Sequence, residues 1–110
     1  MANTFKLKTK ANIGVTTVGI YTATSPVTAT VVIGVTLANT SAAGVNVGVA
    51  VSRGANGDDI NLLKNVPIAQ GASLEYMGGN KLVIETNDTI KVESDVNNSL
   101  DVALTIMEIT

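Results

Sequence analysis

The chain has 110 residues and contains no histidine and no cysteine. These two side chains supply most nucleophiles, general bases and transition-metal ligands near neutral pH, so their absence argues against an enzyme, a zinc-type centre or a disulfide framework. The net charge of −2 argues against a general nucleic-acid binder, which needs clustered lysine and arginine.

Apolar and polar residues alternate along the first half of the chain, a pattern typical of half-buried β-strands. A first strand is predicted at residues 5–10, where Phe5 and Leu7 alternate with lysines, and a second at residues 17–21. A long third strand and a fourth strand follow. The inward positions predicted for these two strands are Val27, Ala29, Val31, Ile33, Val35, Leu37, Val45, Val47, Val49 and Val51.

A loop at residues 39–44 separates the third and fourth strands, and we interpret it as a hairpin connection. Segment 53–59 is rich in Gly, Asn and Asp and predicts the most prominent loop. A strand at residues 62–68 is predicted at a sheet edge or a bulge, because Pro67 cannot donate a ladder hydrogen bond. Short strands at 74–77 and 82–85 flank a turn at Gly78-Gly79-Asn80, and a further turn is expected at Asn87-Asp88. The inward positions predicted for the last two strands are Ile90, Val92, Ser94, Val96, Leu100, Val102, Leu104 and Ile106.

Short strands with frequent turns and no helical stripe indicate an antiparallel sandwich. We therefore predict an all-β fold, a single antiparallel β-sandwich of about eight strands, of jelly-roll or Ig-like type, with residues 1–110 as one domain. We expect no secretory signal, because no apolar run follows the basic N-terminal residues. We also expect no membrane helix, because no stretch approaches the roughly 20 apolar residues required.

Two arrangements of acidic residues are candidate sites, and the sequence argues against both. Asp58 and Asp59, beside Gly57 and Asn56, offer oxygen ligands for Ca²⁺, but their spacing matches no calcium loop. A carboxylate pair for glycoside hydrolysis has six candidate members: Glu85, Asp88, Glu93, Asp95, Asp101 and Glu108. Most of these fall on solvent-facing strand positions, and few aromatic residues are present to line a sugar cleft. We predict no catalytic, cofactor-binding or metal-binding residue.

Charge is distributed unevenly along the chain. Lys6, Lys8 and Lys10 give the first strand a basic face, whereas residues 85–110 carry six acidic residues against Lys91 alone. One interpretation is an edge strand that its lysines protect from aggregation. The other is a strand that docks on an acidic surface of a neighbouring protein. In the second interpretation, the three lysines are the candidate attachment surface.

The surface is expected to be unusually apolar. Only 15% of residues are charged, against roughly 25% in ordinary soluble domains. Some of the surface of so small a domain must then consist of small apolar residues, which favours a protein that packs against neighbours. We expect a homo-oligomer or a subunit of a larger assembly.

The second half of the chain carries a series of strand and turn motifs. They are Pro67-Ile68, Gly71 to Leu74, Lys81 to Val83, Asp88 to Val92, Ser99 to Val102 and Glu108 to Thr110. In this order, residues 66–110 resemble the end of small virion structural proteins of marine tailed phages, of the T4-like cyanophage and related marine phage type. The resemblance rests on strand and turn residues rather than on a catalytic signature.

The resemblance implies a viral structural protein that is not an enzyme and that resides in the virion after synthesis in the host cytoplasm. Our leading hypothesis is a capsid decoration (cement) protein, which contacts the major capsid protein or other virion proteins and binds neither nucleic acid nor membrane. One alternative is a component of the tail, neck, baseplate or a fibre. Another is a receptor- or glycan-binding module, against which the scarcity of aromatic residues argues.

Overall fold

The computed structural model describes residues 2–54, 57–76 and 81–110. The strands in these residues are β1 (Asn3–Ile13), β2 (Val18–Thr22), β3 (Ala29–Asn39), β4 (Val45–Ser52), β5 (Asp59–Ile68), β6 (Ser73–Tyr76), β7 (Leu82–Glu85), β8 (Thr89–Ser94) and β9 (Leu100–Ile109). No part of these three segments is helical, so none provides a helix that could cross a membrane. The all-β prediction is confirmed.

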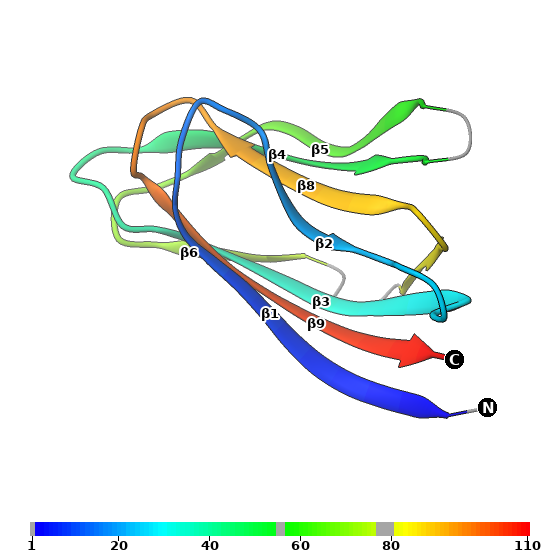
Figure 1. Cartoon of the computed structure of the whole chain (residues 1–110). Coiled ribbons are helices and arrows are strands. Elements are labelled where there is room, and N and C mark those ends of the chain that lie inside the picture. The colour runs from blue at the N-terminus through cyan, green and yellow to red at the C-terminus, as the bar shows by residue number, and fades with distance from the viewer. Residues whose placement is uncertain (1, 55–56, 77–80) are drawn as a thin grey trace.

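The strands form two antiparallel sheets that pack face to face (Figure 1). Sheet A has the order β1-β9-β3-β6, with β7 also paired to β3, and sheet B has the order β2-β8-β4-β5. β6 and β7 pair with successive halves of one edge of β3 and together fill one strand position. Counted in this way, the two four-stranded sheets have the strand order of a jelly roll. The predicted β-sandwich is confirmed, and its topology is the jelly-roll type.

The core lies between the sheets and is almost entirely aliphatic. Strict alternation of buried and more exposed residues holds on β4 and β9, as predicted. Valine, leucine and isoleucine side chains fill every second position of β4, and of β9 up to Ile106. The confirmed inward residues of these strands and of β8 are Val45, Val47, Val49, Val51, Ile90, Val92, Ser94, Leu100, Val102, Leu104 and Ile106. β5 is an edge strand, as its proline predicted, with Pro67 opposite Asn46.

A β-bulge changes which side chains of β3 face the core. The register with β9 shifts between Val32 and Gly34, and an extra residue at a bulge reverses the phase of alternation. The residues of β3 that are buried are Thr30, Val32, Val35, Leu37 and Asn39. Three of the inward positions predicted before the bulge are therefore wrong: Ala29, Val31 and Ile33. Val27, which precedes β3, is buried as predicted. Those predicted after the bulge are confirmed: Val35 and Leu37. A second bulge, in β2 between Gly19 and Tyr21, turns the tyrosine ring into the core.

The segment at residues 39–44 is not the hairpin loop that we predicted. It joins β3 in sheet A to β4 in sheet B, and these two strands do not pair. The side chain of Asn39 holds this crossing. Its Nδ2 donates to the carbonyl oxygens of Ala43 and Ile68, at 2.8 and 3.1 Å, while its Oδ1 accepts from the Ser41 amide at 2.9 Å. The same turn-forming residues suit a hairpin and a sheet-to-sheet connection, so composition does not separate the two.

Three further local predictions have different outcomes. Val96 is exposed and not inward, because β8 ends at Ser94. The turn at Asn87-Asp88 is confirmed, with a positive φ of 76° at the asparagine. The predicted turn at Gly78-Gly79-Asn80 lies outside the described residues.

Candidate functional site: a basic cleft at one edge of the sandwich

A cleft of about 580 Å³ runs along one open edge of the sandwich. β1 and β2 are the edge strands of the two sheets and lie on the same side of the molecule (Figure 1). The lysines of β1 meet hydroxyl-bearing residues of β2 and of the segment that follows it. The polar lining consists of Thr4, Lys6, Lys8, Tyr21, Thr22, Thr24, Glu108 and Thr110.

The register of β1 explains why lysines line the cleft. Lys6 lies opposite Ile106 and Lys8 opposite Leu104, and both of these partners are buried core residues of β9. Directly opposed residues of an antiparallel pair project to the same face, so these lysines point to the side of sheet A that faces sheet B. At the edge of the sandwich that side is open, and the lysines reach solvent there.

A buried polar network forms the floor of the cleft and joins the two sheets. Tyr21 on β2 donates its hydroxyl proton to Glu108 Oε2 at 2.7 Å, and its Oη lies 2.9 Å from Thr30 Oγ1. Since an ionised carboxylate only accepts, the tyrosine proton goes to Glu108 and Thr30 donates to the tyrosine oxygen. Lys6 Nζ lies 2.7 Å from Glu108 Oε1 and completes the network.

These contacts shift the acidity of both central groups. The Lys6 ammonium and the Tyr21 hydroxyl bond to Glu108 and hold the pKa of its carboxyl below the usual range, although burial opposes this. Burial raises the pKa of Tyr21 to about 12, and the neighbouring Glu108 charge adds to the effect. At neutral pH the network therefore contains one carboxylate, one ammonium and a neutral phenol.

Removing the tyrosine hydroxyl should cost stability without disturbing the ring. We expect Tyr21→Phe to lower the free energy of unfolding by about 1 kcal/mol, because buried Glu108 and Thr30 each lose a partner. Tyr76→Phe is the matched control, since the Tyr76 hydroxyl makes only a 3.5 Å contact with the Leu62 carbonyl. Urea denaturation monitored by circular dichroism measures both variants, and equal midpoints would contradict the role of the network.

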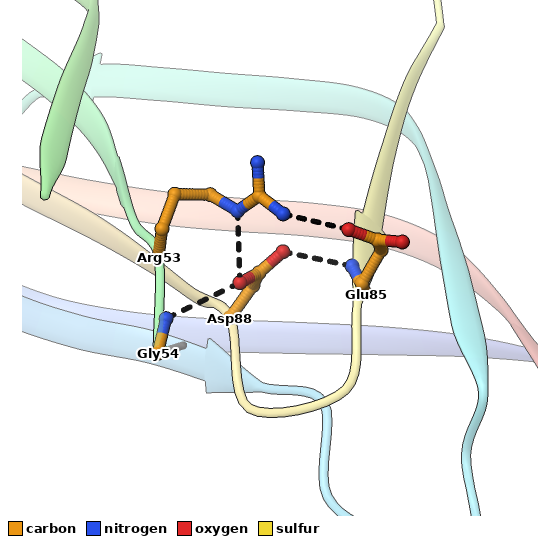
Figure 2. A network of polar contacts seen from close by, with 4 residues as sticks. All are labelled: Arg53, Gly54, Glu85 and Asp88. Atoms are coloured by element: carbon orange, nitrogen blue, oxygen red, sulfur yellow. Dashed lines mark hydrogen bonds and ion pairs between the residues drawn. The ribbon is translucent and has the colours of Figure 1, made fainter. Parts of the chain in front are cut away.

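A second network joins the sheets near the opposite edge (Figure 2). Asp88 Oδ1 accepts from Arg53 Nε at 3.1 Å and from the Gly54 amide at 3.3 Å, while its Oδ2 accepts from the Glu85 amide at 2.8 Å. Arg53 also donates to Glu85 Oε1 at 2.6 Å. Gly54 is required here, because a Cβ would overlap the backbone of Asn87. The network links the end of β4 in sheet B to β7 in sheet A.

The structure brings together two of the three predicted attachment residues. Lys6 and Lys8 line the cleft, but Lys6 is committed to Glu108. Lys10 lies farther along β1, opposite buried Val102, so it has the same phase as Lys6 and Lys8 but does not line the cleft. β1 is an edge strand, as one interpretation predicted, and it pairs with the C-terminal strand of its own chain.

The six candidate carboxylates are dispersed among structural contacts. Glu93 accepts from the Thr17 hydroxyl, Asp95 from the Asn46 amide and Asp101 from the Asn12 amide. The other three belong to the two networks described above. Lowered pKa values at Asp88 and Glu108 suit permanently ionised structural groups and oppose the role of a general acid.

The acidic loop shows no convergence of ligands in the part of the chain that is described. Asp59 Oδ1 lies 3.6 Å from Lys91 Nζ, and the Asp58 carbonyl accepts from the Arg53 amide. Among residues 2–54, 57–76 and 81–110, no three His, Cys, Asp or Glu side chains gather at one point. Asn56, the remaining member of the candidate Ca²⁺ loop, lies outside the described residues.

Sequence reasoning missed both buried networks. A signal existed for Glu108, which continues the inward phase of Leu104 and Ile106 and thereby predicts a buried carboxylate that needs a cation. No such signal existed for Asp88, because it lies in a turn, where alternation does not indicate burial.

No protein-family model and no curated protein matches the chain in sequence, whereas several solved structures share its fold. A protein of the Helicobacter pylori bacteriophage KHP30 capsid has a TM-score of 0.60 at 11% identity, over 99% of this chain and 89% of that one. A protein of the disulfide-linked pili of Bacillus endospore appendages has a TM-score of 0.57 at 15% identity, over 97% and 86%. A protein of infectious bursal disease virus, Gx strain, has a TM-score of 0.55 at 15% identity, over 96% of this chain and 32% of that one. At these identities the likeness establishes a shared fold.

Proposed function

We propose that this chain is a structural protein of a virus particle, and more specifically a decoration protein bound to the outer head shell of a tailed phage. The fold is shared with a phage capsid protein, and the motifs of residues 66–110 resemble those of small virion proteins. The two buried carboxylates serve structural networks. A rigid aliphatic sandwich of this kind suits a protein that acts by contact rather than by turnover.

The observation that carries the proposal is the basic cleft at the free edge of the sandwich. Lys8 lines it, and within the described residues Lys8 makes no ion pair of its own. The hydroxyls of Thr4, Thr22 and Thr24 add hydrogen-bonding groups beside this ammonium. A carboxylate from an acidic surface loop of a shell subunit fits such a site, and complementary charge speeds encounter and fixes orientation.

Attachment of this kind stabilises a shell by mass action. A ligand that binds only the assembled, expanded arrangement of subunits shifts the equilibrium toward that arrangement, by about 2.7 kcal/mol per site at a free concentration 100 times Kd. Heads that lack the protein should then still assemble and package DNA, but should lose their genome at lower temperature or under milder osmotic shock.

The main alternative is a component of the tail, neck or a fibre. The fold shared with the Bacillus pilus protein favours a fibre among these. A glycan-binding role is less well supported, because the ring of Tyr21 is buried and its hydroxyl is bound to Glu108. Quantitative mass spectrometry of purified virions separates head from tail. A copy number on the order of hundreds supports decoration of the head, whereas about six or twelve copies would assign the protein to the neck or baseplate.

Attachment should depend on Lys8. We expect Lys8→Gln to lower occupancy on stripped heads about tenfold at low ionic strength, and the difference should shrink as added salt screens the interaction. Lys64→Gln is the matched control, because Lys64 is an exposed lysine on β5, at the opposite edge of sheet B. Equal occupancy of the two variants at every salt concentration would remove the cleft from the interface. Binding to isolated tails but not to heads would favour the tail alternative.

A further inference from the structure

One half of the outward face of sheet A is apolar, in contrast to the outward face of sheet B. Phe5, Met107, Val31 and Val83 lie in one cross-strand row from β1 through β9 and β3 to β7. The corresponding face of sheet B carries Thr, Ser, Asn, Asp and Lys side chains. Among these are Thr22, Thr89, Lys91, Ser52, Asp59, Asn61 and Asn46. A sandwich that stands alone in water normally presents polar residues on both outer faces.

The side chains of this row are exposed to an unusual degree. Phe5 is 70% exposed, Leu7 beside it 64%, and Val83 at the far end of the row 58%. Strands β1, β9 and β3 lie side by side in one layer (Figure 1), so these side chains form one continuous surface rather than scattered positions. A contiguous apolar patch on a small domain marks a surface that another protein covers.

We propose that a second copy of this chain covers this face. The two copies are related by a twofold axis that lies between them, parallel to the strands and over the middle of sheet A. Such an axis places the β1 border of one copy over the β6–β7 border of the other. Phe5 then packs on Val83 of the second copy, and this contact occurs twice. The A sheets of the two copies then pack face to face, as the two sheets of a single sandwich do.

The area is sufficient for a stable dimer. Four strand positions of about ten residues present a face of roughly 650 Å² at standard strand spacing and rise. A pair of such faces covers roughly 1,300 Å², inside the range of about 1,200–2,000 Å² for specific stable interfaces. The inference concerns the isolated protein and does not depend on attachment to a shell.

Self-association of the purified chain tests the proposal directly. Light scattering coupled to size-exclusion chromatography should show a dimer in the micromolar to millimolar range. The variant Phe5→Ser with Leu7→Ser should raise the dimer Kd by at least about 100-fold, because it removes the largest side chains of the patch. Val15→Ser is the matched control, since Val15 is also exposed but lies in the connection between β1 and β2. A wild-type monomer throughout this range would overturn the proposal, as would a dimer that the double variant leaves intact.

A labelling experiment keeps the test independent of destabilised variants. The chain has no cysteine, so a single introduced thiol reports one position. Thr105→Cys, on the outward face beside Leu7, should become protected from maleimide as the concentration rises. Asn61→Cys, on the outward face of sheet B, should react equally at all concentrations. Equal reactivity of the two thiols would count against the second copy.

Discussion

Replacing Leu104 with alanine is expected to lower the free energy of unfolding by roughly 2–5 kcal/mol. Leu104 is fully buried near the middle of β9, the strand that lies between β1 and β3 in sheet A. Its side chain faces the inter-sheet core beside that of Val35, its partner on β3. Alanine would remove three carbons and leave a cavity that two packed sheets cannot readily close, which places this substitution among the costly core truncations.

Thr105→Ala is the matched control for this effect. Thr105 is the next residue on β9 and is exposed on the outward face. Its truncation should cost about 0.5 kcal/mol or less, as is usual for surface positions. Urea denaturation at low protein concentration compares the two variants without a contribution from self-association. Equal costs would mean that the register of β9 is displaced by one residue, which would exchange its two faces.

The strands that obey simple alternation were predictable, and the reason is local. On β4, and on β9 up to Ile106, every second residue is aliphatic and the residues between are polar or small, so only one face can be buried. Around the bulge of β3 the sequence reads Val31-Val32-Ile33, which is apolar on both faces. No residue there indicates which face is inward, and the pairing with β9 decides it. Which side chains of β3 face the core is therefore decided by a tertiary contact, and sequence periodicity cannot predict it.

The candidate site was predictable only in part. The basic face of β1 was visible because its three lysines share one phase of the alternation. Their surroundings were not visible, because Glu108, the partner of Lys6, lies at the other end of the chain and meets it only through the β1–β9 pairing. Phe5 and Leu7, the apolar residues that alternate with these lysines, suggest an ordinary half-buried strand, yet their side chains point to solvent. β1 is thus turned with its lysines toward the cleft and its apolar residues outward.

Acid should destabilise the protein, and Asp88 should account for a large part of the effect. Burial alone would raise the pKa of Asp88, but bonds from the Glu85 amide, the Arg53 guanidinium and the Gly54 amide outweigh burial and lower it. We expect Asp88→Asn to lower the free energy of unfolding by roughly 1–3 kcal/mol near neutral pH. The asparagine amide group would direct donors at the backbone and guanidinium donors that now bind carboxylate oxygens.

The pH dependence follows from the direction of the shift. A carboxyl whose pKa is lower in the folded state than its unfolded value, about 3.9 for aspartate, stabilises the fold above the unfolded value. This contribution disappears as the pH falls through the folded-state pKa. Glu108 shifts in the same direction, with an unfolded value of about 4.3, so both networks lose their stabilising charge in the same acidic range.

Thermal denaturation from about pH 7 down to about pH 2.5 provides the measurement. The wild type should lose stability steeply below about pH 4, whereas Asp88→Asn should start lower and fall less, so the two curves converge in acid. Asp58→Asn is the matched control, because Asp58 is an exposed aspartate in the loop between β4 and β5 and should give a curve parallel to wild type. Parallel curves for wild type and Asp88→Asn would mean that the Asp88 carboxylate has the same pKa folded and unfolded. That result would contradict the Arg53–Asp88 network, because three hydrogen bonds to the ionised form of a carboxyl group lower its pKa relative to water.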